Sequence, residues 1–153
     1  MRLQRVRLPQ ARFVLKHDEA FDTKTGLTWK RCSVGMVWKD HIGCTGQRAL
    51  IGLNAALKVA EDAGAGWRVP NVKELYSLID NKCGVPPVNV IAFPDLRQLH
   101  HDTDTDADET LYWTTSEFVA ANLVYYVDLY TGDIDAHSRG FPLVRSGSQT
   151  TEP

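Results

Sequence analysis

The sequence GWRVPNVKEL at residues 66–75 decides the fold, because it turns an extended segment directly into a helix. Pro70 fixes one backbone angle and favours an extended conformation in the residue before it. Asn71 can cap the first helical turn, and the Glu74 side chain can return a hydrogen bond to the backbone N–H of Asn71. The apolar residues that follow recur at helical spacing. They predict a helix over residues 72–80 with one buried face.

Length and charge exclude several classes of protein. At 153 residues, with an ordinary globular composition, the chain is expected to form one domain around one core. Its net charge of −2 gives no electrostatic reason to expect a nucleic acid or an anionic membrane as partner. No apolar stretch approaches the roughly 20 residues that span a bilayer. Residues 1–10 are basic and lack the apolar core of a secretory signal, so no signal peptide is visible.

The segments on either side of residues 66–75 predict a mixed architecture. Apolar residues at helical spacing indicate another helix over residues 47–63. The apolar stripe of this helix consists of Leu50, Leu53, Leu57 and Ala60. Strands are predicted at residues 12–16, 27–31, 112–115, 123–130, 134–137 and 141–145. Together these elements predict an α+β domain over residues 12–145, with an arm at residues 1–11 and a flexible tail at residues 146–153.

The three cysteines have different expected roles. Cys32 and Cys44 bracket a short Gly-containing loop, and we expect them to form a disulfide that stabilises the fold by about 3 kcal/mol. The alternative is a pair of reduced, buried thiols. Their spacing does not match a common zinc knuckle. Cys83 is expected to be a buried small apolar residue rather than a nucleophile.

A run of carboxylates, DTDTDADE, occupies residues 102–109. Alternating carboxylates on a loop can converge on calcium, but Ala107 and Trp113 stand where an EF-hand requires Gly and Glu. We expect a solvated acidic loop without metal. The alternative is a looser calcium site, whose candidate ligands are Asp102, Asp104 and Asp106. His100 and His101, beside this run, are candidate ligands for a transition metal.

Four motifs in order resemble those of the Lcl C-terminal domain family, a bacterial and phage family named for a collagen-like adhesin. They are DTKTGLTWKRC at residues 22–32, GWRVPNVKEL at 66–75, YWTTS at 112–116 and LVR at 143–145. The family is grouped with C-type-lectin-like folds. The resemblance therefore implies two helices with twisted antiparallel sheets, on a domain that sits on a cell surface or phage particle and binds a partner.

The resemblance carries no enzymatic chemistry to this chain. The related formylglycine-generating enzymes need a late cysteine pair, and nothing after Cys83 supplies one. The sugar-binding motifs of calcium-dependent lectins are absent as well. No Ser/His/Asp or Cys/His arrangement has a recognisable local context, and no Gly-rich phosphate loop follows a strand. We therefore expect no catalytic activity and no cofactor.

The resemblance also suggests which residues are structural and which meet a ligand. Trp29, Trp67 and Trp113 lie within the motifs and are expected in the core, whereas Trp38 is expected to be exposed. Arg68 and Arg145 are expected to make structural ion pairs or hydrogen bonds. Lectin-like relatives bind ligands with their late strands, and one face of the strand at 123–130 is expected to point outward, with tyrosines suited to recognition. By this analogy the candidate ligand-binding residues are Glu117, Asn122, Tyr126, Tyr130, Asp133, Asp135, His137 and Arg139.

Two functional hypotheses follow. The first is a non-catalytic recognition module, exposed on a bacterial surface or a phage particle, that binds a glycan or a surface protein, alone or as a homotrimer. The second is a structural subunit that docks neighbours in a virion or appendage through its basic arm, residues 2–12.

Overall fold

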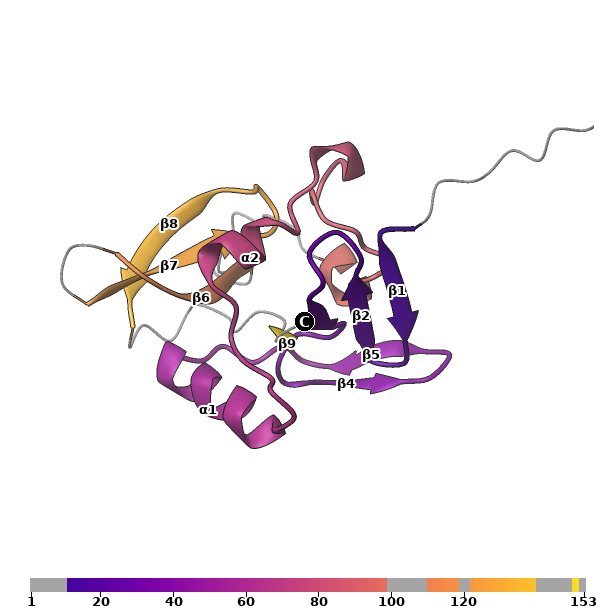
Figure 1. Ribbon diagram of the computed structural model, residues 1–153, viewed down its shortest axis with the longest axis horizontal. Helices are drawn as coiled ribbons and strands as arrows, with labels where there is room; N and C mark the ends of the chain where they lie inside the picture. The colour runs from indigo at the N-terminus through magenta and orange to yellow at the C-terminus, as the bar shows by residue number, and fades with distance from the viewer. Residues whose placement is uncertain (1–10, 99–109, 119–121, 140–149, 152–153) are drawn as a thin grey trace, which may run out of the picture.

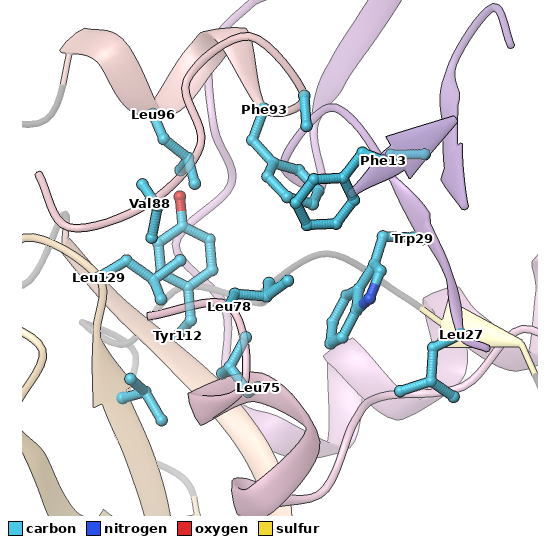
Figure 2. Packing of buried hydrophobic residues seen from close by; sticks show 13 residues of the cluster. Phe13, Leu27, Trp29, Leu75, Leu78, Val88, Phe93, Leu96, Tyr112 and Leu129 are labelled. Carbon is cyan, nitrogen blue, oxygen red and sulfur yellow. The ribbon is translucent and has the colours of Figure 1, made fainter. Parts of the chain in front are cut away.

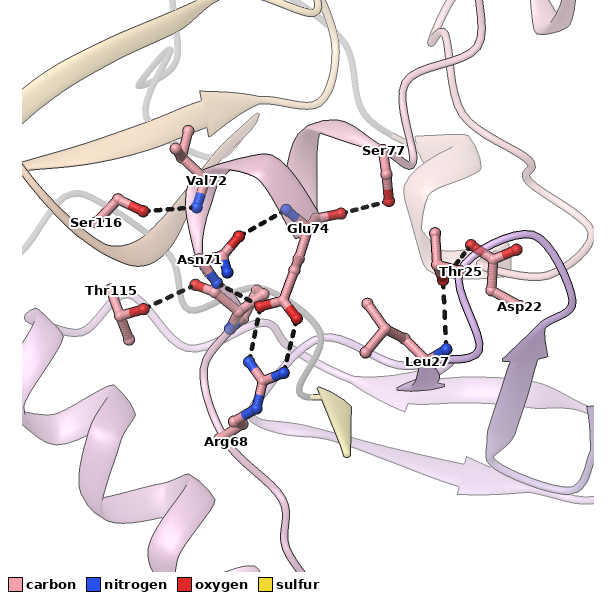
Figure 3. A network of polar contacts seen from close by, with 11 residues as sticks. Asp22, Thr25, Leu27, Arg68, Asn71, Val72, Glu74, Ser77, Thr115 and Ser116 are labelled. Atoms are coloured by element: carbon pink, nitrogen blue, oxygen red, sulfur yellow. Dashed lines mark hydrogen bonds and ion pairs between the residues drawn. The ribbon is translucent and has the colours of Figure 1, made fainter. Parts of the chain in front are cut away.

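Residues 66–75 form the predicted turn into a helix, α2 (Val72–Tyr76). The side chain of Asn71 accepts a hydrogen bond from the backbone N–H of Glu74 at 2.8 Å, and the Glu74 carboxylate accepts one from the N–H of Asn71 at 2.9 Å. Arg68 donates two further hydrogen bonds to this carboxylate, at 2.7 and 2.6 Å (Figure 3). The predicted capping box and the structural role of Arg68 are confirmed.

Helix α2 ends at Tyr76, before the predicted end at residue 80. The backbone N–H of Asp80 donates to the carbonyl of Pro87 at 2.7 Å, so the chain has already turned toward the next segment. Leu75 and Leu78 are buried as predicted, because the turn after the helix keeps Leu78 on the same side.

The computed structural model of the protein describes residues 11–98, 110–118, 122–139 and 150–151. The strands are β1 (Phe13–Lys16), β2 (Glu19–Asp22), β3 (Thr28–Lys30), β4 (Met36–Lys39), β5 (Gly43–Gly46), β6 (Leu111–Glu117), β7 (Leu123–Asp128), β8 (Ile134–Ser138) and β9 (Thr150–Thr151). The remaining elements are α1 (Leu53–Ala63) and the 3-10 helices η1 (Asn81–Cys83) and η2 (Pro94–Gln98).

Within these described residues the strands form three small antiparallel sheets, and with the two α-helices they make an α+β fold consistent with a C-type-lectin-like architecture. The sheets are β1-β2-β3-β9, β4-β5 and β6-β7-β8. Figure 1 shows the β6-β7-β8 sheet at one end of the molecule and strands β1, β2, β4 and β5 at the other, with α2 between them. The predicted α+β class is confirmed.

The first helix begins six residues later than predicted, at Leu53 rather than residue 47. The preceding segment is engaged elsewhere, since the N–H of Ala49 donates to Val34 O at 2.8 Å and Ile51 O accepts from the Trp113 indole. Leu50 therefore lies outside the helix and is exposed, which corrects the predicted stripe. The residues of α1 that are buried are Leu53, Ala56 and Ala60.

Strands β6 and β7 of the β6-β7-β8 sheet are covered on both faces, since their adjacent residues belong to different cores, whereas no residue of β8 is buried. On one face, Trp113 and Val124 pack with the buried residues of α1. On the other, a larger cluster joins α2 to β1–β3 and the segment around η2 (Figure 2). That cluster includes Phe13, Trp29, Leu75, Phe93, Tyr112 and Val127. The expectation that the strand at 123–130 would have an outward face was wrong, whereas the three core tryptophans are confirmed.

The loop predicted between Cys32 and Cys44 contains a hairpin, β4-β5. The predicted disulfide is confirmed, with a Cα–Cα distance of 5.5 Å. Gly35 has a φ of +93°, and a Cβ added there would lie 2.7 Å from backbone atoms of Gln47 and Ala49. Glycine thus allows the hairpin base to touch the segment before α1. The strands were missed because both are short and β5 has glycine at two of its four positions.

Two residues of the predicted flexible tail, Thr150 and Thr151, form strand β9 and pair with Thr28 and Trp29 of β3. This strand closes the edge of the first sheet. The predicted strand at 141–145, including Arg145, lies outside the described residues, as does the arm at residues 1–10.

Asp22 is a buried carboxylate at the turn between β2 and β3. Arg12 donates to both of its oxygens, at 2.9 and 2.7 Å, and the Lys24 N–H and Thr25 hydroxyl donate as well. Burial raises the pKa of Asp22, but these hydrogen bonds outweigh burial and hold the pKa below its usual value.

We expect Asp22→Asn to make the free energy of unfolding fall less steeply as the pH is lowered. A carboxyl group whose folded-state pKa is depressed stabilises the fold above its unfolded pKa, near 4, and that stability is lost as the pH falls through the folded pKa. Urea unfolding from about pH 7 down to about pH 2 measures the slope of the free energy of unfolding against pH. Asp62→Asn, at an exposed position on α1, is the control and should keep the wild-type slope. Equal slopes in the two variants would contradict this assignment.

Candidate functional site

Three of the predicted ligand-binding residues, Glu117, Asn122 and Arg139, meet in one cleft of about 80 Å³. Strand β6 ends beside the start of β7, where Glu117 pairs with Val124, and β8 ends next to them. The pairing of the strands thus brings residues from three separate segments to one end of the sheet. We call this cleft the strand-end cleft; its other lining residues are Phe118, Leu123 and Val124.

The strand-end cleft presents opposite charges to solvent. Arg139 Nη1 lies 3.5 Å from Glu117 Oε1, and Arg139 Nη2 lies 3.4 Å from Asn54 Oδ1. The side chain of Glu117 is 74% exposed and that of Arg139 39%. Because an exposed pair with such distances is weak, both groups can exchange partners with a ligand. The backbone carbonyl of Arg139 accepts a hydrogen bond from the N–H of Leu53, which anchors this rim to α1.

The other predicted candidates lie elsewhere. Tyr126 pairs with Asp135 across β7 and β8, on the face that α1 covers, and Tyr126 packs against the core there. His137, opposite Val124, lies on the same face. Tyr130 packs against the larger core, and Asp133 is exposed at the β7-β8 turn. The eight candidates therefore do not form one site, because Tyr126 and Tyr130 pack against cores and Asp133 lies at the end of the strands opposite the strand-end cleft.

Two larger grooves border α1, and the sequence pointed to neither. The first, which we call the hairpin groove, has a volume of about 230 Å³ and lies between β4 and α1. It is lined by Asp18, Lys30, Cys32, Ser33, Val34, Gly35, Met36, Trp38 and Val59. The second, the elbow groove, has a volume of about 390 Å³. It is lined by Leu57, Ala60, Glu61, Trp67, Arg68, Val69, Asn71 and Thr115. Only tertiary contacts bring these segments together.

Trp38 is half-buried, not exposed as predicted. The guanidinium of Arg31 lies 4.2 Å from the centre of its ring, in cation–π geometry. The indole N–H donates to Asp40 Oδ1 at 3.0 Å. Its fixed ring beside a groove is a feature that the sequence alone did not indicate.

A buried polar cluster lies behind the hairpin groove. The Ser33 hydroxyl donates to Asp95 at 2.6 Å and lies 2.8 Å from the hydroxyl of Tyr112. Burial raises the pKa of Asp95, although the hydrogen bond from Ser33 opposes this shift. Burial, together with the charge of Asp95, raises the pKa of Tyr112 to about 12. All three residues are enclosed, so the cluster joins β6, η2 and the segment before β4 rather than offering a reactive group.

Cys83 corrects another prediction, because its thiol is exposed rather than buried. Partial desolvation, with the nearby charge of Asp80, raises the pKa of this thiol, which lowers the thiolate fraction. The exposure of Cys83 therefore does not make it a better candidate for a nucleophile.

The metal predictions fall on parts of the chain that are not described. His100, His101 and the acidic run at 102–109 lie outside the described residues. Among the residues that the structure does describe, no group of three His, Cys, Asp or Glu side chains is arranged to hold a metal ion. In the same residues, no helix has the length and apolar character needed to cross a membrane.

Comparison with known proteins identifies one family. The family model described as the Lcl C-terminal domain matches residues 19–145, which include the turn at residues 66–75, both α-helices and the strands that form the strand-end cleft. No curated protein and no solved structure matches the chain.

Proposed function

Because the chain belongs to the Lcl C-terminal domain family, a surface- or adhesion-type domain, we propose that it is a non-catalytic recognition module. It binds a glycan or a surface protein, at a bacterial surface or on a phage particle. The observation that carries this proposal is the strand-end cleft, where Glu117, Asn122 and Arg139 project exposed polar groups from the ends of paired strands.

The geometry of the strand-end cleft supports binding of a polar ligand. Asn122 has a left-handed backbone conformation, with φ of +62°, which turns the chain sharply into β7. Polar groups carried on strand ends are held more rigidly than groups on free loops, so less conformational entropy is lost when a ligand orders them. The Cys32–Cys44 disulfide is compatible with an extracellular location, where disulfides persist.

We expect Arg139→Ala to weaken ligand binding at least about tenfold while leaving the free energy of unfolding nearly unchanged. A hydrogen bond to a charged group contributes about 1.5–3 kcal/mol, and about 1.4 kcal/mol is tenfold in affinity. The contacts of Arg139 within the protein are long and exposed, so their loss costs little stability. The measurement is titration of the purified chain with hits from a glycan array or with a captured surface protein.

Lys58→Ala is the matched control, because Lys58 is a cation on the exposed face of α1 outside the cleft. Unchanged affinity in Lys58→Ala and loss in Arg139→Ala would support the proposal. A chain that neither binds any glycan nor captures any surface protein would overturn it.

A second candidate function is a docking subunit of a larger assembly, which one observation favours. Val14 and Phe21 are cross-strand neighbours on β1 and β2, and they are 53% and 41% exposed. Strand β1 is also an edge of its sheet, directly after the basic arm. An exposed apolar pair beside the edge of a sheet suits contact with another chain, either a neighbour or a second copy in a homotrimer. Light scattering of wild type and Phe21→Thr tests this: a larger mass only in wild type supports docking, and two monomers argue against self-association.

A further inference from the structure

The hairpin groove contains a fixed aromatic ring beside paired hydrogen-bonding groups. Its walls come from the turn after β1, from β3, from the base of the hairpin and from α1. The Cys32–Cys44 disulfide and the close approach at Gly35 hold the hairpin base in place. The groove is therefore a fixed part of the folded domain rather than a gap between mobile segments.

The Trp38 ring is held by the Arg31 guanidinium that stacks on it. The Arg31 guanidinium that stacks on it donates hydrogen bonds to the backbone carbonyls of His17, Ile91 and Ala92, at 2.9, 3.0 and 2.9 Å. Arg31 therefore cannot swing away without losing these bonds. Trp38 is among the residues that line the hairpin groove, whereas Arg31, which stacks on its ring, is not.

The polar groups of the hairpin groove are balanced in charge. Lys30 Nζ lies 3.1 Å from Asp18 Oδ2, with the two side chains 28% and 44% exposed. The Lys30 ammonium also lies 4.4 Å from the centre of the Trp67 ring, which fixes its position. The ammonium offers donors and the carboxylate offers acceptors, side by side and partly open to solvent. No net charge results from the pair.

These features select one class of ligand. A flat apolar ring next to donors and acceptors complements a sugar, which has a C–H face and a rim of hydroxyl groups. A sulfated glycan would need unpaired cations, and Lys30, the one cation among the described residues that line the groove, is already paired. At about 230 Å³ the groove is smaller than the roughly 300–1,000 Å³ of pockets for drug-sized ligands, so it suits a single ring.

We propose that the hairpin groove binds one neutral sugar ring of a glycan, with the C–H face on Trp38 and the hydroxyl groups on Asp18 and Lys30. This inference rests on the proposed recognition function and specifies the ligand class and a second contact site. The strand-end cleft then contacts another part of the same glycan or another partner.

The test is an array of neutral and sulfated glycans, followed by titration with a panel of methyl hexopyranosides. We expect wild type to bind a neutral sugar with little dependence on salt, since no net charge is involved. Trp38→Ala should weaken this binding at least tenfold, and Trp38→Phe should weaken it less because an aromatic face remains. Val37→Ala is the matched control: Val37 is the adjacent, 61% exposed residue of β4, outside the groove lining, and its replacement should leave affinity unchanged.

Folding and binding are separated by a second variant. Asp18→Asn should weaken sugar binding several-fold, and because Asp18 is partly exposed its replacement leaves the fold intact. Should Trp38→Ala fail to fold, Asp18→Asn and Trp38→Phe decide the question. Weaker binding in both, with wild-type unfolding curves, supports the proposal.

Different results would overturn this inference and the proposed function separately. Binding that survives in Trp38→Ala but is lost in Arg139→Ala would overturn the sugar site and leave the recognition function standing. So would capture of a surface protein with a blank array, or binding only to sulfated glycans with steep salt dependence. A chain that binds neither glycans nor proteins would overturn both.

Discussion

Replacing Trp113 with alanine is expected to lower the free energy of unfolding by about 4 kcal/mol, within the roughly 3–5 kcal/mol typical of such changes. Trp113 is fully buried between β6 and α1, where it packs in one cluster with Val69 and Val124. Its indole N–H donates to the carbonyl of Ile51 at 2.8 Å, so the variant also leaves this partly buried acceptor without that donor. The result would be a cavity beneath α1 and, through Ile51, a loosened start of that helix.

Urea unfolding followed by circular dichroism measures the effect of Trp113→Ala. Trp113→Phe is the matched variant, because it keeps most of the buried volume and removes the N–H donor; we expect a loss of about 1–2 kcal/mol. The difference between the two variants then separates packing from the hydrogen bond. A loss below about 1.5 kcal/mol for Trp113→Ala would mean that α1 does not pack on this side chain as described.

Replacing both Cys32 and Cys44 with serine is expected to lower the free energy of unfolding by about 3 kcal/mol. The disulfide closes a loop with a sequence separation of 12 residues, which restricts the unfolded chain. The bond also ties β5 to the chain just after β3, so its loss should free the hairpin base and with it the wall of the hairpin groove.

Urea unfolding with and without a thiol reductant tests the role of the disulfide. Reduced wild type should unfold like the double variant, and reductant should not affect the double variant. Cys83→Ser is the control, because that thiol is exposed and unpaired by any disulfide, and it should match wild type. An equal shift on reduction in the double variant would show that the loss does not come from the Cys32–Cys44 bond.

Local chemistry made some features predictable from the residues. The cap at Asn71 and Glu74 depends on atoms three residues apart, so its geometry follows from the sequence. The turn before β3 and the Cys32–Cys44 pair are similarly short-range. Helix α1 shows the limit: its periodic pattern extends upstream of Leu53, but tertiary hydrogen bonds at Ala49 and Ile51 hold that segment out of the helix.

The candidate site was predictable only in part. Analogy with late strands placed Glu117, Asn122 and Arg139 in one region, and the strands do bring them together. The same analogy placed Tyr126 and Tyr130 in this region, but both pack against cores. The alternation of residues along one strand does not reveal that helices cover both of its faces. The hairpin groove was not predictable, since its lining comes from residues up to 41 positions apart, from Asp18 to Val59.

By itself, the sequence determined the class of fold, the cap that begins α2, the disulfide and the tryptophans of the core. Each depends on contacts close along the chain or on a strong tendency of large apolar side chains to leave water. Only the tertiary structure decided where α1 begins, which face of each late strand is covered and which polar groups meet at a cleft or groove. Those outcomes depend on contacts between distant segments, whose geometry no local pattern contains.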